Sequence, residues 1–453
     1  MAISARAALL AAVGVVWVVL SPTTGTAWAW LAVVAAVCAL DALAAVSPRS
    51  LGVRREVRGP IRADETTTST VELTNPGRRG VRADVRDAWP PSLTPTPRHR
   101  VAVAGGGSAL VTTTLAPTRR GTRHADYVSL RVWGPLGIAA RQVSLAAPLS
   151  LAVLPEFRSR RLLPSRLARL HELEGSTATI LRGPGTEFDS LRDYVRGDDP
   201  RDIDWRASAR ARDLVVRTWR PERDRHVVLV LDVGRSGALL LGAPGAGGGG
   251  DPTDEGGRGA DVVDLGVAPR LDAGIEAALL LSALADRAGD NVHLLALDRT
   301  VRARVSGVRG PGLMRQVAEA MSDVTASLDP IDWSLVVSEV RRTVHHRSLV
   351  VLVTELPPAG SDPDFLDAVS TLSSGHVVLV ASALDPDLAR LASDRTDARA
   401  VFRAAAADAT LRSLSEGARD VERAGASVLE VDAGLLAARV SDAYLALKKS
   451  GRL

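Results

Sequence analysis

Residues 183–236 constrain the fold of this 453-residue chain more than any other stretch. Acids and arginines alternate along its first part, and the apolar run of residues 226–233, which contains Asp232, follows. A continuous apolar run of this kind is typical of a strand that a parallel sheet buries on both faces. The stretch therefore predicts an ion-paired segment that leads into the first strand of an α/β domain.

The pattern after residue 226 agrees with this prediction. Short apolar runs alternate with helical patterns, and the runs lie near residues 291–297, 301–305, 349–354, 377–381 and 427–431. Such an order indicates a doubly wound α/β sheet, which we expect to occupy residues 226–450. Residues 242–270 are so rich in glycine and acids that we expect a disordered loop there.

The acid–arginine segment, residues 185–217, has the composition of a set of ion pairs. Closely spaced guanidinium and carboxylate groups can pair in bidentate fashion, with two aromatic side chains as apolar contacts beneath them. These ion pairs would then hold the extended segment against the next domain. The residues assigned to this role are Glu187, Asp189, Arg192, Tyr194, Gly197, Asp198, Asp199, Arg201, Asp204, Trp205, Arg206 and Arg210.

The same segment also allows a catalytic interpretation. Four carboxylates could gather a divalent cation or act as general acid and base, namely those of Asp198, Asp199, Asp202 and Asp204. The segment contains no histidine or cysteine, which disfavours this alternative.

Two apolar runs near the N-terminus predict a membrane hairpin in residues 1–48. Residues 7–20 are apolar, and residues 27–46 are apolar except for Asp41. At about 1.5 Å per residue the second run spans roughly the 30 Å of a bilayer core, whereas the first needs residues 2–5 to approach it. We expect Asp41 to reach the lipid headgroups, and we expect interfacial anchors at Trp17, Trp28 and Trp30.

Charge predicts the side of the membrane on which the rest of the chain lies. One arginine precedes the hairpin and four follow it, so the positive-inside rule places both ends in the cytoplasm; these are Arg6, Arg49, Arg54, Arg55 and Arg58. Residues 49–169 carry 21 arginines against 8 acids, which suits a part that meets anionic headgroups. A signal peptide cleaved near residues 27–29 is the alternative, but the apolar run continues past that point to Leu40.

Two further regions lie between the hairpin and the α/β domain. Residues 49–155 show short alternating runs separated by Gly and Pro turns, which predict a small antiparallel β-sandwich of immunoglobulin-like architecture. Residues 156–225 would hold a basic amphipathic linker helix followed by the acid–arginine segment.

The acid–arginine segment and the strand after it resemble the membrane-protein family known as domain of unknown function 58. Its members are similar in having a membrane hairpin, a strand-rich insertion and a domain like the von Willebrand factor type A domain, and are thought to act with MoxR-type AAA+ ATPases. The resemblance implies a membrane-tethered scaffold or adaptor that binds such an ATPase and its clients.

The α/β order also resembles the von Willebrand factor type A domain itself. That domain binds metal through an Asp-x-Ser-x-Ser turn after its first strand, a Thr from a later loop and an Asp after its fourth strand. The matching positions are Asp232, Gly234, Ser236 and Glu355, and the turn at residues 310–312 supplies no threonine. The resemblance implies a degenerate site, with Mg²⁺ held by Asp232, Ser236 and Glu355 and by water.

The expected function is therefore protein binding without enzymatic activity, at the cytoplasmic face of the cell membrane. The chain has no glycine-rich phosphate loop with a lysine, so we expect it not to bind a nucleotide directly. Its arginines are not interleaved with aromatic residues, which disfavours nucleic acid as a partner. A metal-dependent hydrolase that uses the carboxylates between Asp198 and Asp204 is the alternative.

Overall fold

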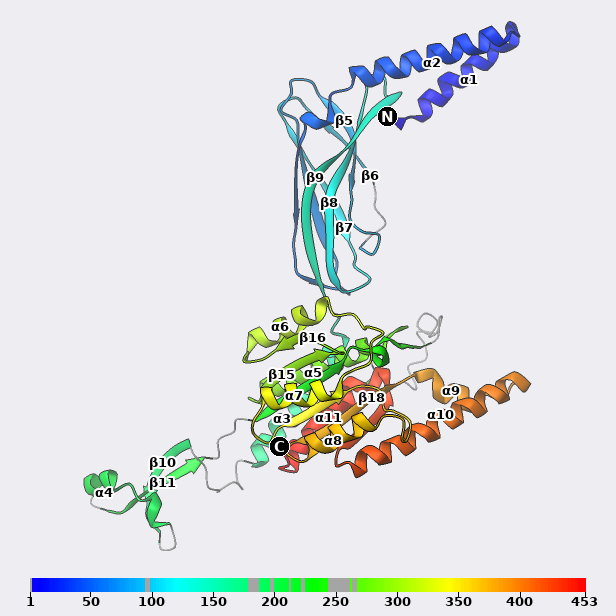
Figure 1. The fold of residues 1–453 in the computed structure, drawn as a ribbon. Coiled ribbons are helices and arrows are strands. Elements are labelled where there is room, and N and C mark those ends of the chain that lie inside the picture. The colour runs from blue at the N-terminus through cyan, green and yellow to red at the C-terminus, as the bar shows by residue number, and fades with distance from the viewer. Residues whose placement is uncertain are drawn as a thin grey trace. The chain divides into compact units, whose positions relative to one another are not determined.

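The computed structural model describes residues 2–93, 98–177, 187–195, 199–211, 213–220, 225–242, 261–262 and 267–453 (Figure 1). The chain forms two compact units, Met1–Glu156 and Phe157–Leu453. The first contains two apolar helices and a β-sandwich, and the second contains an α/β sheet with helices on both faces. The prediction of a mixed α/β chain with several sheets is confirmed.

The β-sandwich consists of two sheets whose inner faces share a hydrophobic core. One sheet has the order β1-β9-β8-β5-β6, with β3 beside β9, and the other has the order β2-β4-β7. Val81, Ala83 and Val85 alternate with polar residues and point into the core, as the period of two predicts. The strands are β1 (Ala2–Ile3), β2 (Gly52–Val57), β3 (Ile61–Arg62), β4 (Thr67–Thr74), β5 (Val81–Asp87), β6 (Arg98–Val103), β7 (Ser108–Leu115), β8 (Gly121–Trp133) and β9 (Ala139–Leu154), and the short helix η1 (Pro48–Ser50) precedes β2.

A buried ion pair crosses the sandwich core. Arg55 of β2 and Asp87 of β5 approach to 2.7 Å, with side chains 1% and 0% exposed. Arg55 is one of the arginines of the predicted membrane flank, but the sandwich uses it internally. No local sequence pattern reveals this pair, because the two residues belong to different sheets.

Helices α1 (Ala5–Leu20) and α2 (Thr24–Ala44) pack against each other. The indole N–H of Trp30 donates to the carbonyl oxygen of Leu10 at 3.3 Å, and a Cβ at Gly14 would overlap the Trp30 ring. Gly14 therefore allows close helix packing. Trp30 contacts the neighbouring helix instead of serving only as the predicted interfacial anchor, whereas Trp17 and Trp28 are exposed.

Of the helices that the structure describes, α2 is long and apolar enough to cross a membrane. The sequence led us to expect that residues 2–5 extend the shorter α1, but α1 begins at Ala5 and residues 2–4 lie outside it. Ala2 and Ile3 instead pair with Ala140 and Ala139 of β9. The chain therefore runs from strand β1 of the sandwich directly into α1.

Asp41, close to the C-terminal end of α2, does not reach outward as predicted. Its buried side chain accepts hydrogen bonds from the backbone N–H groups of Leu136 (2.8 Å), Ile138 (2.8 Å) and Ala139 (2.9 Å), in the connection between β8 and β9. Arg6 of α1 donates to the carbonyl oxygen of Leu136 at 2.9 Å. Both helices therefore bind the same turn of the sandwich.

The predicted linker helix packs on the second unit. It begins as a 3₁₀ turn, η2 (Arg158–Leu162), and continues as α3 (Leu163–Thr177). Glu276 of α5 (Arg270–Arg287) accepts hydrogen bonds from the backbone N–H groups of Arg158 (2.9 Å) and Ser159 (3.1 Å). The buried Arg166 pairs with Asp261 at 2.7 Å. These contacts support a structural role for the helix.

A six-stranded sheet forms the centre of the second unit, with the order β16-β15-β12-β17-β18-β19. All neighbours are parallel except β16, which is antiparallel to β15. β12 lies in the middle, so the chain adds strands first on one side of it and then on the other. The strands are β12 (His226–Asp232), β15 (Asn291–Leu297), β16 (Val301–Val305), β17 (Leu349–Val353), β18 (Val377–Leu384) and β19 (Ser427–Asp432).

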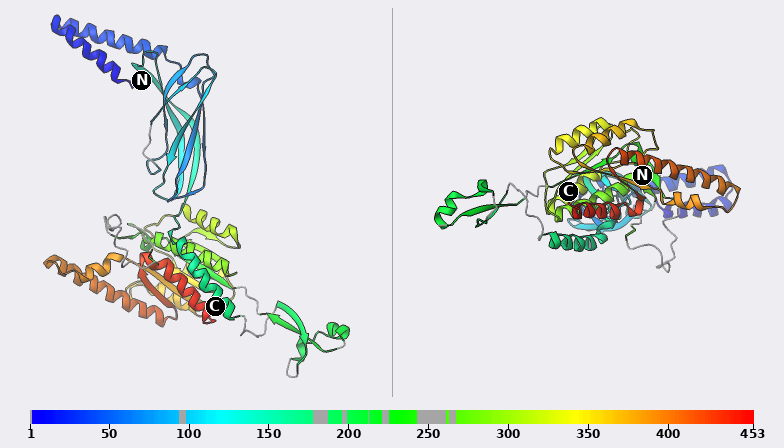
Figure 2. Two further views of the ribbon diagram at one scale, coloured as in Figure 1. Left: turned by 180° about the vertical axis from the view of Figure 1, so that it is seen from behind. Right: turned by 90° about the horizontal axis from the view of Figure 1, so that it is seen from below.

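Helices cover both faces of this sheet (Figure 2). Val228 and Val230 of β12 face α7 and α8 within one hydrophobic cluster, and α5 and α11 contact the strands from the other face. Two helices, α9 and α10, lie between β18 and β19. The remaining helices are α6 (Pro311–Ser322), α7 (Trp333–Thr343), α8 (Pro363–Ser373), α9 (Pro386–Ser393), α10 (Ala398–Arg423), η5 (Ala433–Leu435) and α11 (Leu436–Lys449).

The predicted disordered loop at residues 242–270 is ordered at its C-terminal end. Residues 243–260 and 263–266 lie outside the described residues. Strand β14 (Ala268–Pro269) pairs with β13 (Leu240–Leu241), and α5 already begins at Arg270. The end of the glycine-rich stretch therefore returns to the sheet edge where β12 ends.

Candidate functional site

The candidate site lies at the carboxyl end of β12, where the strand order reverses. Asp232 is the last residue of β12, which has β15 on one side and β17 on the other. In doubly wound sheets the strands on either side of such a point leave room for a ligand beyond their carboxyl ends. The position of Asp232 thus agrees with the prediction from sequence.

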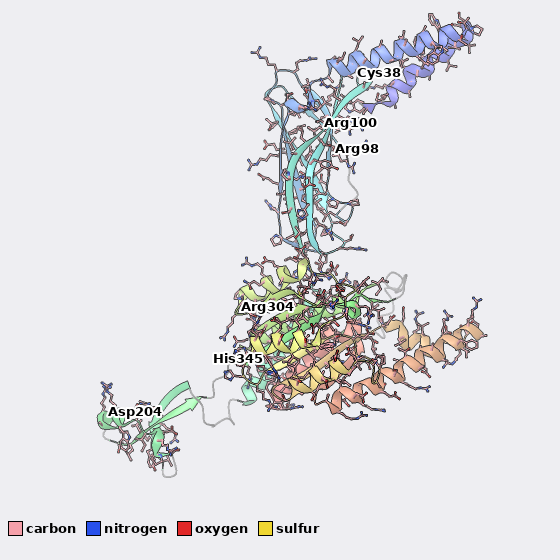
Figure 3. The ribbon with its side chains drawn as sticks, viewed as in Figure 1. Cys38, Arg98, Arg100, Asp204, Arg304 and His345 are labelled. Atoms are coloured by element: carbon pink, nitrogen blue, oxygen red, sulfur yellow. The ribbon has the colours of Figure 1, made fainter. Side chains whose placement is uncertain are left out.

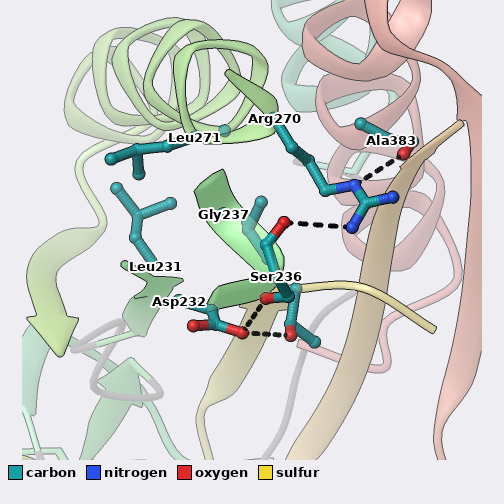
Figure 4. Close-up of a pocket in the computed structure, with 10 residues that line it drawn as sticks. Leu231, Asp232, Ser236, Gly237, Arg270, Leu271 and Ala383 are labelled. Carbon is teal, nitrogen blue, oxygen red and sulfur yellow. Dashed lines mark hydrogen bonds between the residues drawn. The ribbon is translucent and has the colours of Figure 1, made fainter. Parts of the chain in front are cut away.

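The carboxylate of Asp232 is buried and surrounded by hydrogen-bond donors (Figure 4). It accepts a hydrogen bond from the backbone N–H of Gly234 at 2.8 Å and from the Thr354 hydroxyl at 2.7 Å, and it also accepts one from the Ser236 hydroxyl. Burial raises the pKa of Asp232 above the ordinary value, because the low-dielectric surroundings disfavour the charged form. The hydrogen bonds oppose this shift without cancelling it.

Gly234 replaces the first serine of the predicted metal-binding turn for a steric reason. A Cβ at this position would lie 2.6 Å from the carbonyl oxygen of Asp329 and 3.0 Å from a carboxylate oxygen of Asp232. The backbone N–H of Arg235 donates to the same Asp329 carbonyl at 2.8 Å, which holds the loop close. A serine side chain therefore does not fit here without a shift of the loop.

Arg270, which the sequence did not single out, connects the predicted residues. Its guanidinium group donates to the carbonyl oxygens of Ser236 and Ala383, both at 3.1 Å, and pairs with Glu355 at 3.0 Å. The Arg270 residue is 8% exposed, whereas the Glu355 side chain is 43% exposed. The Glu355 carboxylate therefore pairs with Arg270, whereas Asp232 and Ser236 are hydrogen-bonded to each other.

These residues do not fit a magnesium ion well. Mg²⁺ requires near-octahedral oxygen coordination, but Asp232 already accepts three hydrogen bonds and Glu355 is paired with Arg270. The cavity beside Asp232 has a volume of about 10 Å³, close to the space of a single water molecule. Within the described part of the chain, no group of three or more His, Cys, Asp or Glu residues is arranged to hold a metal.

A second carboxylate follows the neighbouring strand β15. Asp298 is fully buried and accepts hydrogen bonds from Arg302 (2.8 Å), the Thr300 backbone N–H (2.9 Å) and the Ser327 hydroxyl (2.9 Å). Burial alone would raise the pKa of Asp298, but these donors lower it well below the ordinary value. Asp298 is therefore ionised and fixes the loop that contains Ser327.

Four exposed apolar side chains lie in the segments near this end of the sheet. Leu239 and Leu240 follow β12, Val267 precedes β14, and Leu328 follows Ser327, whose backbone N–H donates to Val233 at 2.7 Å. The exposed fractions of these four residues are 49%, 59%, 45% and 81%. We call Leu239, Leu240, Val267 and Leu328 the apolar rim.

The acid–arginine segment forms a strand pair of its own, with β10 (Glu187–Asp193) antiparallel to β11 (Val215–Arg220). Between the strands lie η3 (Pro200–Asp202) and α4 (Trp205–Ala211). Asp204, shown in Figure 3, pairs with Arg217 at 2.9 Å and accepts a hydrogen bond from the Ala207 backbone N–H at 2.9 Å. These two contacts lower the pKa of Asp204, so it is ionised.

Other predicted members of this segment have different roles. Asp199 caps η3 through the Arg201 backbone N–H, and the Tyr194 backbone N–H donates to Leu214. The expectation that Trp205 is an apolar contact beneath the ion pairs is wrong, because Trp205 is 68% exposed. Arg201, Arg206 and Arg210 are exposed, and Arg192 donates to the carbonyl oxygen of Asp193. Gly197, Asp198 and the side chains of Glu187 and Asp189 lie outside the described residues.

The predicted catalytic cluster gains no support from this geometry. Among its described members, Asp199 and Asp204 accept hydrogen bonds from the backbone of the helical turns that follow them. Asp202 lies within η3. Carboxylates that cap helices serve the local fold, and the described ones do not converge on one point.

Comparisons with known proteins find a family model and several relatives that are similar to part of this chain. The family model described as protein of unknown function DUF58 matches residues 190–240, which include β11, β12 and Asp232. Uncharacterized proteins of Mycobacterium tuberculosis and Mycobacterium bovis are 23% identical over 220 residues, which is 47% of this chain and 60% of each relative. The match thus spans less than two thirds of these relatives.

Solved structures with some likeness have low overall similarity. The CARDB domain of a Pyrococcus furiosus protein, crystallised with di-metal ions, is 19% identical with a TM-score of 0.18; the match covers 23% of this chain and 94% of that one. A FixG-related protein of Vibrio parahaemolyticus is 8% identical with a TM-score of 0.18, over 24% of this chain and 98% of that one. A protein of unknown function from Porphyromonas gingivalis is 13% identical with a TM-score of 0.20, and the match covers 33% of this chain and 60% of that one.

Proposed function

We propose that this chain is a member of the DUF58 family of proteins of unknown function and acts as a membrane-tethered scaffold or adaptor without enzymatic activity of its own. Its α/β domain, von Willebrand A-like in strand order, binds partner proteins at the carboxyl end of the sheet, beside a degenerate metal site. The partner we propose from the family resemblance is a MoxR-type AAA+ ATPase with its clients. The two N-terminal helices cross the cell membrane, and the rest of the chain faces the cytoplasm.

The apolar rim is the observation that carries this proposal. Four large apolar side chains are exposed in the segments near one end of the sheet, where a partner protein would remove them from water. Beneath them, Asp232, Ser236 and Arg270 form a satisfied network that holds the loops in place. A rigid surface of this kind loses little conformational entropy on binding, which favours protein recognition.

The contacts of the N-terminal helices support a hairpin. β1 pairs with β9, and Asp41 near the end of α2 binds the turn before β9, so the sandwich holds both ends of the helix pair. If α2 crosses the membrane, α1 must cross back for Ala2 and Ile3 to reach the sheet. The 16 residues of α1 span about 24 Å, a mismatch that local bilayer thinning accommodates at modest cost.

The same contacts argue against a cleaved signal peptide. Cleavage near residues 27–29 would remove β1, Arg6 and all of α1, and with them the contacts of Arg6 with Leu136 and of Trp30 with Leu10. Arg49, Arg54 and Arg58 flank α2 on the side of the sandwich, which favours a cytoplasmic location for it.

Binding of a purified MoxR-type ATPase of the same organism to the detergent-solubilised full-length chain tests the proposed function. We expect Leu240→Glu combined with Leu328→Glu to weaken capture at least tenfold, because two charges would have to be buried in the interface. Phe402→Glu is the matched control, since Phe402 is 78% exposed on α10 and is not a member of the rim. Equal capture by all variants would contradict the proposal.

Two further measurements separate the proposed scaffold from a metal-dependent binding site and from a hydrolase. Because the described residues fit Mg²⁺ poorly, we expect EDTA to leave capture unchanged, and a loss that Mg²⁺ restores would favour the metal site. Divalent-dependent hydrolysis of a substrate that Asp199→Ala abolishes would favour the hydrolase.

Membrane topology is tested with single cysteines in a Cys38→Ala background. We expect a membrane-impermeant maleimide to label Ser21→Cys, in the turn between α1 and α2, in intact cells. Arg100→Cys, in β6 of the sandwich, should be labelled only after the cells are opened. The reverse pattern would place the soluble units outside the cytoplasm.

A further inference from the structure

A larger cavity lies at the opposite end of the same sheet. Its volume is about 390 Å³, within the range of small-molecule sites. The amino ends of β12, β17 and β18 meet at this edge, because the three strands are parallel and in register. The lining residues are Arg225, His226, Arg347, Ser348, Val377, Gly451, Arg452 and Leu453.

Three arginines from separate parts of the chain line this cavity. Arg225 precedes β12, Arg347 precedes β17, and Arg452 follows α11. No aspartate or glutamate is among the lining residues. In the part of the chain that the structure describes, none of the three guanidinium groups forms an ion pair or donates a hydrogen bond. Leu453 also lines the cavity, so the main-chain carboxylate at residue 453 offsets at most one of the three positive charges.

A purely structural role explains these arginines poorly. Helices end at this edge of the sheet, and positive side chains there stabilise the partial negative charge of the helix C-termini. Lys448 fills that role, since its ammonium group donates to the carbonyl oxygen of Ala288 at the end of α5 at 3.3 Å and pairs with Asp290 at 3.1 Å. The three arginines make no such contact with a helix end that the structure describes.

A histidine completes the lining. His226 lies against the buried His293, with ring nitrogens 2.9 Å apart and ring centroids 5.2 Å apart. This contact fixes the imidazole at the cavity wall.

We propose that this cavity binds a small phosphate-bearing anion. Guanidinium groups present paired N–H donors that match phosphate oxygens, and three of them around one cavity can neutralise a doubly or triply charged group. The site lies at the opposite end of the sheet from Asp232, so it is independent of the protein-binding surface proposed above. A soluble phosphate compound and a phosphorylated lipid headgroup share this chemistry.

Isothermal titration of the full-length chain in detergent with inorganic pyrophosphate at low salt tests the proposal. We expect binding that weakens at least tenfold in the double variant Arg225→Ala with Arg347→Ala. Arg399→Ala is the control, because Arg399 is an exposed arginine on α10 outside the cavity, and it should bind as the natural chain does. The milder variant Arg225→Lys with Arg347→Lys keeps the charge but not the paired donors, and should lose affinity to an intermediate degree.

Flotation with vesicles that contain phosphatidylinositol 4-phosphate distinguishes the two sources of phosphate. Pyrophosphate binding without vesicle binding identifies a soluble ligand, and vesicle binding that the double lysine variant weakens identifies a headgroup. The proposal is overturned if neither probe binds, or if Arg399→Ala weakens binding as much as the cavity variants do.

Discussion

At the carboxyl end of the central sheet, the buried groups Asp232, Arg270 and Asp298 are hydrogen-bonded to the surrounding loops. At the amino end, three arginines line an open cavity without a carboxylate side chain. Asp232, Arg270 and Asp298 each contact several partners, and the space beside Asp232 is about 10 Å³. The amino-end cavity is about 390 Å³. Charges at the first end therefore stabilise loops, whereas charges at the second remain available to a ligand.

This difference reverses the usual expectation for an α/β sheet. Ligands of such folds normally bind beyond the carboxyl ends of the strands, where loops at the switch point leave a crevice. Here Arg270 and Leu271, at the start of α5, help to fill that crevice. What remains there is a surface with exposed apolar side chains, which suits a protein better than a small molecule.

Replacement of Arg270 should give the largest effect on stability. Arg270→Ala removes two charge-assisted hydrogen bonds to buried carbonyl oxygens and should lower the free energy of unfolding by about 3 kcal/mol. Thermal unfolding of the full-length chain in detergent measures this loss. Arg412→Ala, which breaks an exposed pair with Asp408, should change stability by about 0.5 kcal/mol or less. Similar midpoints for both variants would show that Arg270 does not hold this end of the sheet.

Thr354→Val should have a smaller effect at the same place. The substitution keeps the shape of the side chain but removes the 2.7 Å hydrogen bond to buried Asp232, at a cost of about 1–2 kcal/mol. Thr410→Val, on the exposed side of α10, is the matched control and should be nearly neutral. If the two valine variants unfold at the same temperature, the Asp232 network contributes no stability.

The contrast between the two ends also explains what the sequence could predict. Asp232 and Ser236 lie four residues apart next to an apolar strand, so a local pattern was sufficient to place them together. Thr354 and Arg270 join the site through tertiary contacts across the sheet, and no local pattern reveals such a pairing. Arg270 was further concealed because it is the last residue of the stretch, 242–270, that we expected to be disordered.

The amino-end cavity was invisible in the sequence for the same reason. Its arginines come from three distant segments, each of which carries a single unremarkable arginine next to a strand or helix end. The position of Asp41 was predicted wrongly because hydropathy describes the helix alone, without the turn between β8 and β9 that Asp41 contacts. Trp205 was misjudged because an aromatic residue among charges suggests burial, whereas the short helix α4 leaves it exposed.

The pH dependence of Asp232 tests whether the carboxyl end is closed. Burial raises the folded-state pKa of Asp232, so the contribution of this group to stability is fully present below the unfolded-state pKa of about 3.9 and is lost as pH rises through the raised folded value. Asp232→Asn cannot titrate. We therefore expect its thermal midpoint, relative to that of the natural chain, to rise as pH increases above 4. A constant difference between the two chains from pH 4 to pH 8 would mean that Asp232 is accessible to water.

The smallest effect on stability is expected at the amino end. Arg347 is exposed and forms no ion pair in the described chain, so Arg347→Ala should change the free energy of unfolding by no more than about 0.5 kcal/mol. Pyrophosphate should raise the thermal midpoint of the natural chain by mass action, and less so that of Arg347→Ala. Arg399→Ala should respond to pyrophosphate as the natural chain does. A large loss of stability in Arg347→Ala without ligand would mean that this arginine supports the fold, and the two ends of the sheet would then not differ as described.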